Sequence, residues 1–114
     1  MMLDKGRHGR EQILSRATVE LMSSDQLTPE QRAGSEIFFE AHSGWGLGMA
    51  VDIWRTEIYH NPGRYGWTGG FGTTAYLDPA EGMLGILFTQ RMMDSPESAK
   101  VFSDFWTLEY EAIE

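Results

Sequence analysis

The stretch that decides the fold begins at residue 63 and reads Gly63-Arg64-Tyr65-Gly66-Trp67-Thr68-Gly69-Gly70-Phe71-Gly72-Thr73-Thr74. Five of these twelve residues are glycine, so the backbone can approach a neighbour closely or adopt dihedral angles that a Cβ atom forbids. The chain continues through Ala75-Tyr76-Leu77-Asp78-Pro79, a turn, and then Met83-Leu84-Gly85-Ile86-Leu87-Phe88-Thr89-Gln90. This order predicts a strand that offers its backbone at a site, followed by a hairpin into a buried strand.

The residues before this stretch add one more strand. Small and large side chains alternate over Trp45-Gly46-Leu47-Gly48-Met49-Ala50-Val51, which is typical of a strand with one tightly covered face. Asn61-Pro62-Gly63 indicates a turn. The remaining strands are predicted over residues 65–70, 73–78 and 83–90, with a hairpin loop at Asp78-Pro79-Ala80-Glu81-Gly82.

Helix signals flank the predicted strands. Ser15 is the expected cap of a short helix, and Thr28-Pro29-Glu30-Gln31 has the capping-box spacing that starts one or two further turns. Near the C-terminus, Ser95 is the expected cap of a longer helix, with Pro96 and Glu97 in its first turn. That helix carries an apolar stripe of Val101, Phe102, Phe105, Trp106, Leu108 and Ile113. Its solvated face is expected to hold Glu109, Glu111 and Glu114.

These elements predict a single α+β domain, with an antiparallel sheet of three to five strands and the C-terminal amphipathic helix packed on one face. Residues 1–43 are expected to form short helices and loops, residues 44–92 the antiparallel strands, and residues 95–114 the C-terminal helix. The main structural concern is an exposed sheet edge, because such an edge favours self-association.

Composition excludes several classes of function. The net charge of −8 repels phosphate backbones and anionic lipids, so neither nucleic acid nor a membrane is an expected partner. The absence of cysteine excludes disulfides, thiol nucleophiles and cysteine-type zinc sites. No apolar run approaches the roughly 20 residues that span a bilayer, and the first residues do not form a signal peptide. The expected chain is soluble, cytoplasmic by default and without a cofactor.

The residue inventory contains no complete catalytic set. Neither G-x-S-x-G nor S-x-x-K occurs, and the three histidines are never spaced i,i+4 as a helical metal pair requires. No metal site is therefore expected. A cluster drawn from several loops, such as His42, His60 and Asp52, stays open as the alternative to plain surface-loop histidines. Residues 66–70 lack the G-x-x-x-x-G-K-[ST] pattern of a phosphate-binding loop.

The order of these segments resembles the C-terminal portion of the serine β-lactamase and penicillin-binding-protein superfamily, and in particular its class C β-lactamase-like and esterase branch. The segments that carry the resemblance are residues 9–22, 44–51, 65–70, 73–79, 85–90 and the closing helix. No single motif among them is highly specific, but their order and spacing together are.

The resemblance implies a third-signature strand. Trp67-Thr68-Gly69 stands in the place of K-T-G and would bind substrate, and the backbone N–H of Gly70 would be one of two oxyanion-hole donors. Because Trp67 cannot offer a cation to a carboxylate, an uncharged ester or amide is the expected substrate. The simpler interpretation makes Trp67 a sheet aromatic packed on a neighbour.

The other two signatures do not follow the family. S-x-x-K is absent, and Tyr59-His60-Asn61 spells Y-x-N too close to Trp67 to be the second signature. We therefore expect a C-terminal fragment of a serine hydrolase that is inactive alone, because the family places its nucleophile earlier in the chain. The alternatives are a self-associating interaction or scaffold protein and a small-ligand module that uses the glycine-aromatic strand for stacking.

Overall fold

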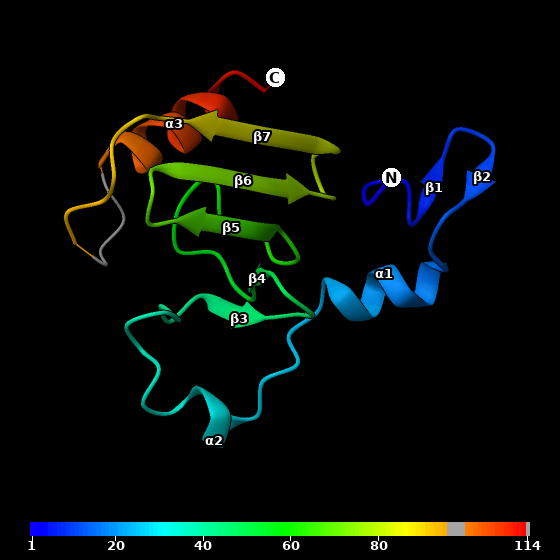
Figure 1. The fold of residues 1–114 in the computed structure, drawn as a ribbon, viewed down its shortest axis with the longest axis horizontal. Coiled ribbons are helices and arrows are strands. Elements are labelled where there is room, and N and C mark those ends of the chain that lie inside the picture. The colour runs from blue at the N-terminus through cyan, green and yellow to red at the C-terminus, as the bar shows by residue number, and fades with distance from the viewer. Residues whose placement is uncertain (96–99, 114) are drawn as a thin grey trace.

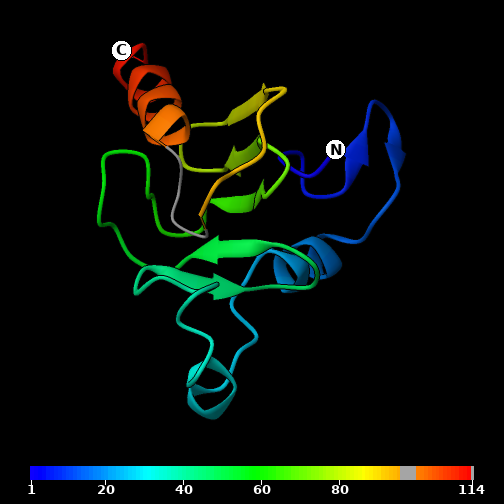
Figure 2. The same ribbon diagram turned by 60° about the vertical axis from the view of Figure 1, so that its left-hand side comes forward.

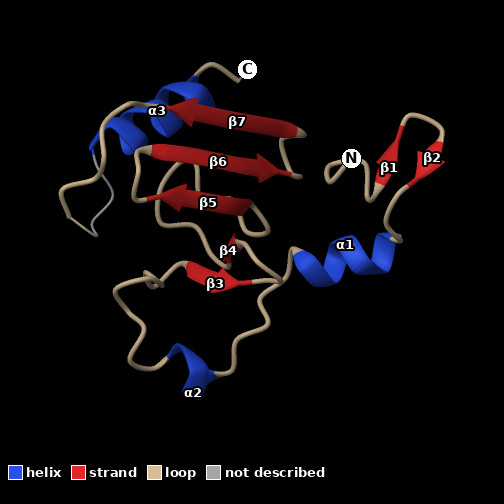
Figure 3. Cartoon of the chain, viewed as in Figure 1, coloured by secondary structure: helices blue, strands red, loops and turns tan. Residues whose placement is uncertain are grey.

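We describe the fold from a computed structural model, in which residues 1–95 and 100–113 are described (Figure 1). The elements in chain order are β1 (Arg7–His8), β2 (Glu11–Gln12), α1 (Arg16–Met22), α2 (Pro29–Arg32), β3 (Ser43–Trp45), β4 (Ala50–Asp52), β5 (Tyr65–Gly69), β6 (Thr73–Asp78), β7 (Met83–Phe88) and α3 (Lys100–Glu111). Figure 3 shows where helices and strands alternate along this path.

The centre of the molecule is one antiparallel sheet in the order β3-β4-β5-β6-β7. Neighbouring strands pair in simple hairpin register, for example Trp67 with Ala75 and Ala75 with Ile86. Helix α3 covers one face of this sheet at the β7 end (Figure 2). The predicted α+β architecture is therefore confirmed. Strands β1 and β2 form a separate two-stranded hairpin that lies apart from the main sheet in both views.

The prediction of one strand over residues 45–51 is wrong, because the chain reverses there. Strands β3 and β4 are the two arms of a hairpin, and Gly44 pairs with Val51. The Gly46 N–H donates to the Met49 carbonyl at 2.8 Å, and Gly48 adopts a φ of +94° that favours glycine. Gly48 therefore belongs to a tight turn, whereas Gly44 and Gly46 are buried where a Cβ atom would overlap Asp25 and the Met22 carbonyl.

Strand β7 also differs from its prediction as a buried strand. Its side chains alternate, so that Gly85 is buried beneath α3 while Leu84, Ile86 and Phe88 are exposed on the opposite face. A Cβ atom at Gly85 would overlap the Trp106 ring and the Glu109 carboxylate, so glycine is what lets the helix approach. Strand β7 is an edge strand with one apolar face uncovered by the described residues.

The core lies between α3 and the sheet, and it is built on the i,i+4 series Phe102, Trp106 and Tyr110. The predicted stripe was partly wrong, because Val101, Leu108 and Ile113 are exposed. The expected cap falls partly outside the described residues, since Pro96 and Glu97 are not among them. Glu114 is also outside them.

The expected solvated face of α3 needs one correction. Glu111 is exposed, but Glu109 is half-buried, and its Oε2 atom has no hydrogen-bond partner within residues 1–95 and 100–113. Burial raises the pKa of the Glu109 carboxyl, and the Arg64 charge opposes that rise. Glu109 is partly covered because it faces Gly85, the position where the helix approaches the sheet most closely.

The buried carboxylate of Asp78 holds the loops around this core. Its Oδ1 accepts the Ala80 N–H in the β6–β7 turn, and its Oδ2 accepts the Asn61 amide at 2.7 Å and the Tyr110 hydroxyl. Asn61 therefore has a structural role, as its turn assignment predicted. Among the described residues, no helix is long and apolar enough to cross a bilayer.

Both N-terminal helix signals were read correctly. Ser15 caps α1 through the Thr18 N–H, and Thr28 and Gln31 form the reciprocal capping box of α2. Helix α1 reaches the sheet through its end, because the Met22 carbonyl accepts the Leu47 N–H in the β3–β4 turn.

Candidate functional site

Strand β5 carries the residues that the sequence marked as a site. Thr68 lies on the α3 side, where its hydroxyl hydrogen-bonds Thr74 at 2.9 Å and Thr74 accepts the Trp106 indole N–H. Trp67 lies on the opposite side of the strand, with its ring edge-on to Trp45 at 5.0 Å. Trp67 is nevertheless 43% exposed, so packing on its neighbour leaves much of the indole free to contact another molecule.

Gly70 follows β5 directly and is exposed. Its carbonyl accepts the Met93 N–H at 2.8 Å, which fixes the peptide against the segment after β7. Among residues 1–95 and 100–113, none accepts a hydrogen bond from the Gly70 N–H. No described residue would lie within 4 Å of a Cβ atom at Gly70. Within the described part of the chain, the Gly70 N–H is thus a backbone donor without an acceptor at the end of β5.

A cavity of about 740 Å³ brings most of the predicted site together. Trp67, Thr68 and Gly70 line it, whereas Gly69 does not. The opposite walls come from α3, from residues 37–42 and the start of β3, and from the long loop between β4 and β5. Its size is in the range of small-molecule sites.

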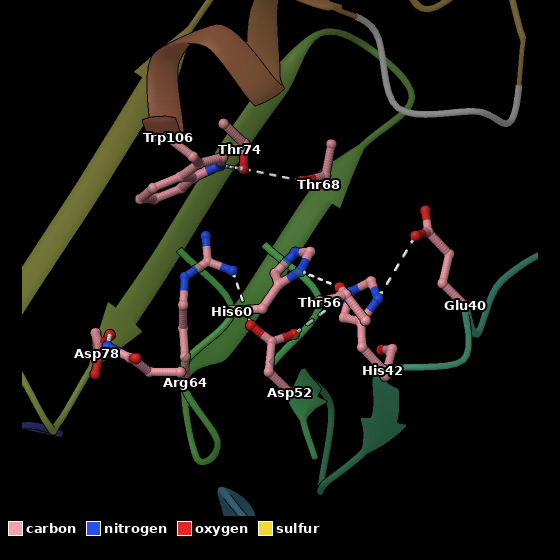
Figure 4. A network of polar contacts seen from close by, with 12 residues as sticks. Glu40, His42, Asp52, Thr56, His60, Arg64, Thr68, Thr74, Asp78 and Trp106 are labelled. Carbon is pink, nitrogen blue, oxygen red and sulfur yellow. Dashed lines mark hydrogen bonds and ion pairs between the residues drawn. The ribbon is translucent and has the colours of Figure 1, made fainter. Parts of the chain in front are cut away.

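Arg64 lies buried at the wall of this cavity, and sequence reasoning missed it (Figure 4). Its Nη1 donates to Asp52 Oδ2 at 3.0 Å, and both side chains are at most 3% exposed. The guanidinium stacks on the rings of Tyr76 and Trp106, 3.9 and 4.3 Å from their centroids. Its Nε and Nη2 have no hydrogen-bond partner among the residues that the structure describes. The only sequence signal was a lone arginine directly before a predicted strand.

Two histidines meet Asp52 beside Arg64. The rings of His42 and His60 stack with centroids 3.8 Å apart, and His42 Nε2 is 3.7 Å from Asp52 Oδ1. Each histidine is only 9% exposed, so the interpretation as surface-loop histidines is wrong and the open alternative of a loop-built cluster is correct. The β4–β5 loop creates the cluster by folding back over the end of β4.

The environment sets the ionisation of this cluster. Burial, assisted by the charges of His42 and Arg64, lowers the pKa of His60 to about 3. Burial raises the pKa of Asp52, and the adjacent Arg64 opposes that rise. Tyr59 packs edge-on against His60, and burial raises the pKa of its hydroxyl above the ordinary value. His60 is therefore a neutral imidazole.

We expect His60 to make the folded chain acid-sensitive. Above about pH 6.5 the His60 imidazole is neutral in both the folded and the unfolded chain, so protonation does not reduce the free energy of unfolding there. As the pH falls from about 6.5 towards 3, only the unfolded chain binds the proton, and the free energy of unfolding falls by up to about 1.4 kcal/mol per pH unit. Urea unfolding in EDTA at several pH values should show a shallower decline for His60→Gln. The exposed His8→Gln control should keep the parent's decline, and equal slopes for all three proteins would contradict this prediction.

Comparison with known proteins places this geometry in context. A family model described as Beta-lactamase matches residues 6–102. Two similar curated proteins are the uncharacterized protein MT1414 of Mycobacterium tuberculosis strain CDC 1551 / Oshkosh and protein Rv1367c of Mycobacterium tuberculosis strain ATCC 25618 / H37Rv. Each is 31% identical over 101 residues, which cover 82% of this chain and 25% of the relative. The chain spans about a quarter of the length of these relatives.

Proposed function

Because the chain belongs to the beta-lactamase family, we propose that it supplies one wall of a serine-hydrolase active site. In this proposal the enzyme is an esterase or amidase that works through an acyl-enzyme, and β5 is its third-signature strand. The nucleophile and its base come from a segment outside these 114 residues, since the sequence has no S-x-x-K. The chain alone is then inactive.

The observation that supports this proposal most is the Gly70 N–H. In acyl transfer the carbonyl oxygen of the substrate becomes an oxyanion, and a donor that is already fixed in place stabilises it without reorganisation. Among the described residues, none accepts a hydrogen bond from the Gly70 N–H, the Gly70 carbonyl accepts the Met93 N–H, and glycine has no side chain to obstruct a substrate. It also lines a cavity large enough for a small ester.

Trp67 supports an uncharged substrate. Trp67 is among the residues that line the cavity, and its half-exposed indole on the side of β5 opposite α3 brings no charge, whereas lysine at the same position would attract a carboxylate. Thr68 is fixed by the Thr74 hydroxyl, so the strand presents its side chains in a defined geometry. In this proposal Trp67 and Thr68 contribute to substrate binding. Gly69 connects them to Gly70 and does not itself line the cavity.

A host enzyme makes the substrate preference testable. The host is a β-lactamase-like esterase with both missing signatures, in which this chain replaces the host's own third-signature strand and C-terminal helix. We expect the chimera to hydrolyse p-nitrophenyl acetate in preference to nitrocefin, which carries a carboxylate. Trp67→Lys should move the ratio of kcat/KM towards nitrocefin by about tenfold, the value of one hydrogen bond to a charged group. Trp54→Lys, an exposed tryptophan that is not in the cavity lining, is the matched control. An unchanged ratio for Trp67→Lys would contradict this role.

A second candidate function is self-association of a non-catalytic scaffold, and the exposed sheet face favours it. Leu84, Ile86 and Phe88 are 51%, 49% and 76% exposed on the face of β7 opposite α3. Apolar area of this kind on an edge strand is a site where a second copy of the chain can pack.

For this scaffold we expect concentration-dependent dimers in sedimentation velocity. Ile86→Lys should shift the chain towards monomer, because it places a charge in the middle of the apolar face. Val101→Lys serves as the control, since Val101 is similarly exposed at 48% but lies on α3. A chain that is monomeric at every concentration, or equal effects of both variants, would exclude this second function.

A further inference from the structure

We propose that His42, Asp52 and His60 form a binding site for a divalent transition-metal ion of the Zn²⁺ class. One ligand atom from each residue lies within 4.8 Å of the other two. The three residues come from separate places in the chain, namely the segment before β3, the end of β4 and the β4–β5 loop (Figure 4). This site is independent of the proposed hydrolase role.

The hydrogen bonds and ion pairs of these three residues use atoms other than the ones that would bind the ion. The Nδ1 of His60 contacts the Thr56 hydroxyl at 2.7 Å, and the Nδ1 of His42 faces Glu40 at 3.5 Å, so both Nε2 atoms remain for an ion. Asp52 uses Oδ2 for Arg64 and keeps Oδ1 on the histidine side. Metal-binding histidines commonly donate their second ring N–H to a carboxylate or another polar oxygen, which fixes the ring orientation.

The donor set indicates the metal. Two imidazoles and one carboxylate suit Zn²⁺, Fe²⁺ or Co²⁺, whereas Mg²⁺ and Ca²⁺ prefer oxygen ligands alone. Three protein ligands leave at least one coordination position, as in open zinc sites. Both histidines line the 740 Å³ cavity, so water or a small ligand can reach that position.

Two features limit the affinity of this site. The Arg64 charge beside Asp52 opposes a dication, and Glu40 on the far side of His42 partly offsets it. The ring planes of His42 and His60 are only 18° apart, and the lone pair of each Nε2 atom lies in the plane of its ring. Binding therefore requires one ring to tilt so that both Nε2 atoms aim at the ion. We expect affinity below that of a closed four-ligand zinc site.

Titration of the untagged 114-residue chain with Zn²⁺ tests the site. Isothermal titration calorimetry should show one Zn²⁺ ion bound per chain. Bound Co²⁺ should give the visible absorption bands that are typical of Co²⁺ with a low coordination number. His60→Gln keeps a polar side chain of similar size and should weaken Zn²⁺ binding more than tenfold. Thr56→Val removes only the hydroxyl that contacts the Nδ1 of His60, and it should weaken Zn²⁺ binding by about tenfold. Loss of a group that orients a metal-binding histidine usually weakens metal binding by about 10–100-fold, and we expect the smaller value because Thr56 is exposed.

The control is the third histidine of the chain. His8 is exposed on β1, outside the cluster, so His8→Gln should bind Zn²⁺ like the parent chain. Near-ultraviolet circular dichroism verifies that each variant is folded. The proposal is overturned if the parent chain binds no Zn²⁺ saturably, or if His60→Gln binds as tightly as the parent. It is also overturned if His8→Gln, and not His60→Gln, removes the site.

Discussion

Replacing Arg64 with leucine is expected to lower the free energy of unfolding by about 3–5 kcal/mol. The substitution leaves the Asp52 carboxylate 2% exposed without its closest cation, and it removes the stacked contacts with Tyr76 and Trp106. A buried charge that loses its partner costs more than the pair itself contributes, because desolvation is no longer compensated. Urea denaturation followed by tryptophan fluorescence measures the change.

Two further variants separate the charge effect from the loss of packing. Arg55→Leu removes an exposed arginine from the same loop and should change stability by less than about 0.5 kcal/mol. Combining Arg64→Leu with Asp52→Asn removes the stranded charge, so the double variant should be more stable than Arg64→Leu alone. If Arg64→Leu costs less than about 1 kcal/mol, the Asp52–Arg64 pair does not organise this region.

Replacing Gly70 with proline is expected to reduce kcat of the chimeric esterase about 10²–10³-fold, or about 2.7–4 kcal/mol of transition-state stabilisation. Proline has no N–H, so the variant deletes the proposed oxyanion donor itself. Rates of p-nitrophenyl acetate hydrolysis, with kcat and KM determined separately, provide the measurement. We expect the loss mainly in kcat, because the donor bonds most strongly to the charge that develops in the transition state.

Gly70→Ala is the matched control for that experiment. Alanine keeps the N–H, and its Cβ would meet none of the described residues within 4 Å, so kcat should stay within a few fold of the parent. Equal losses for alanine and proline would mean that the backbone shape of this turn matters and that its N–H does not.

The β5–β7 hairpins could be predicted from sequence because their signals are local. Alternating side chains and the Asp78 turn fix the strands within two residues of Tyr65–Gly69, Thr73–Asp78 and Met83–Phe88. The β3–β4 hairpin could not, since alternating glycine is compatible with both an extended strand and a tight turn. Gly48 adopts its left-handed conformation where α1 meets the turn, at a contact far away in sequence.

The sequence predicted the part of the site on β5 but not the buried cluster around Asp52. The residues of β5 follow each other in the chain, so a motif could mark them. The buried cluster depends on how the β4–β5 loop folds over Asp52, and Arg64 is enclosed by Trp106 from a helix about 40 residues later. No periodic pattern links residues at such separations, so only the folded chain brings His42, His60 and Arg64 together.

Labelling with a fluorophosphonate probe tests the central claim most directly, because this reagent reacts with activated serine nucleophiles. The chain is incubated alone and together with the host esterase that lacks its own third-signature strand and C-terminal helix, and mass spectrometry locates the label. We predict no labelling of either protein alone, and labelling of the host's S-x-x-K serine when both are present. A label on any serine of the isolated 114-residue chain would contradict the account.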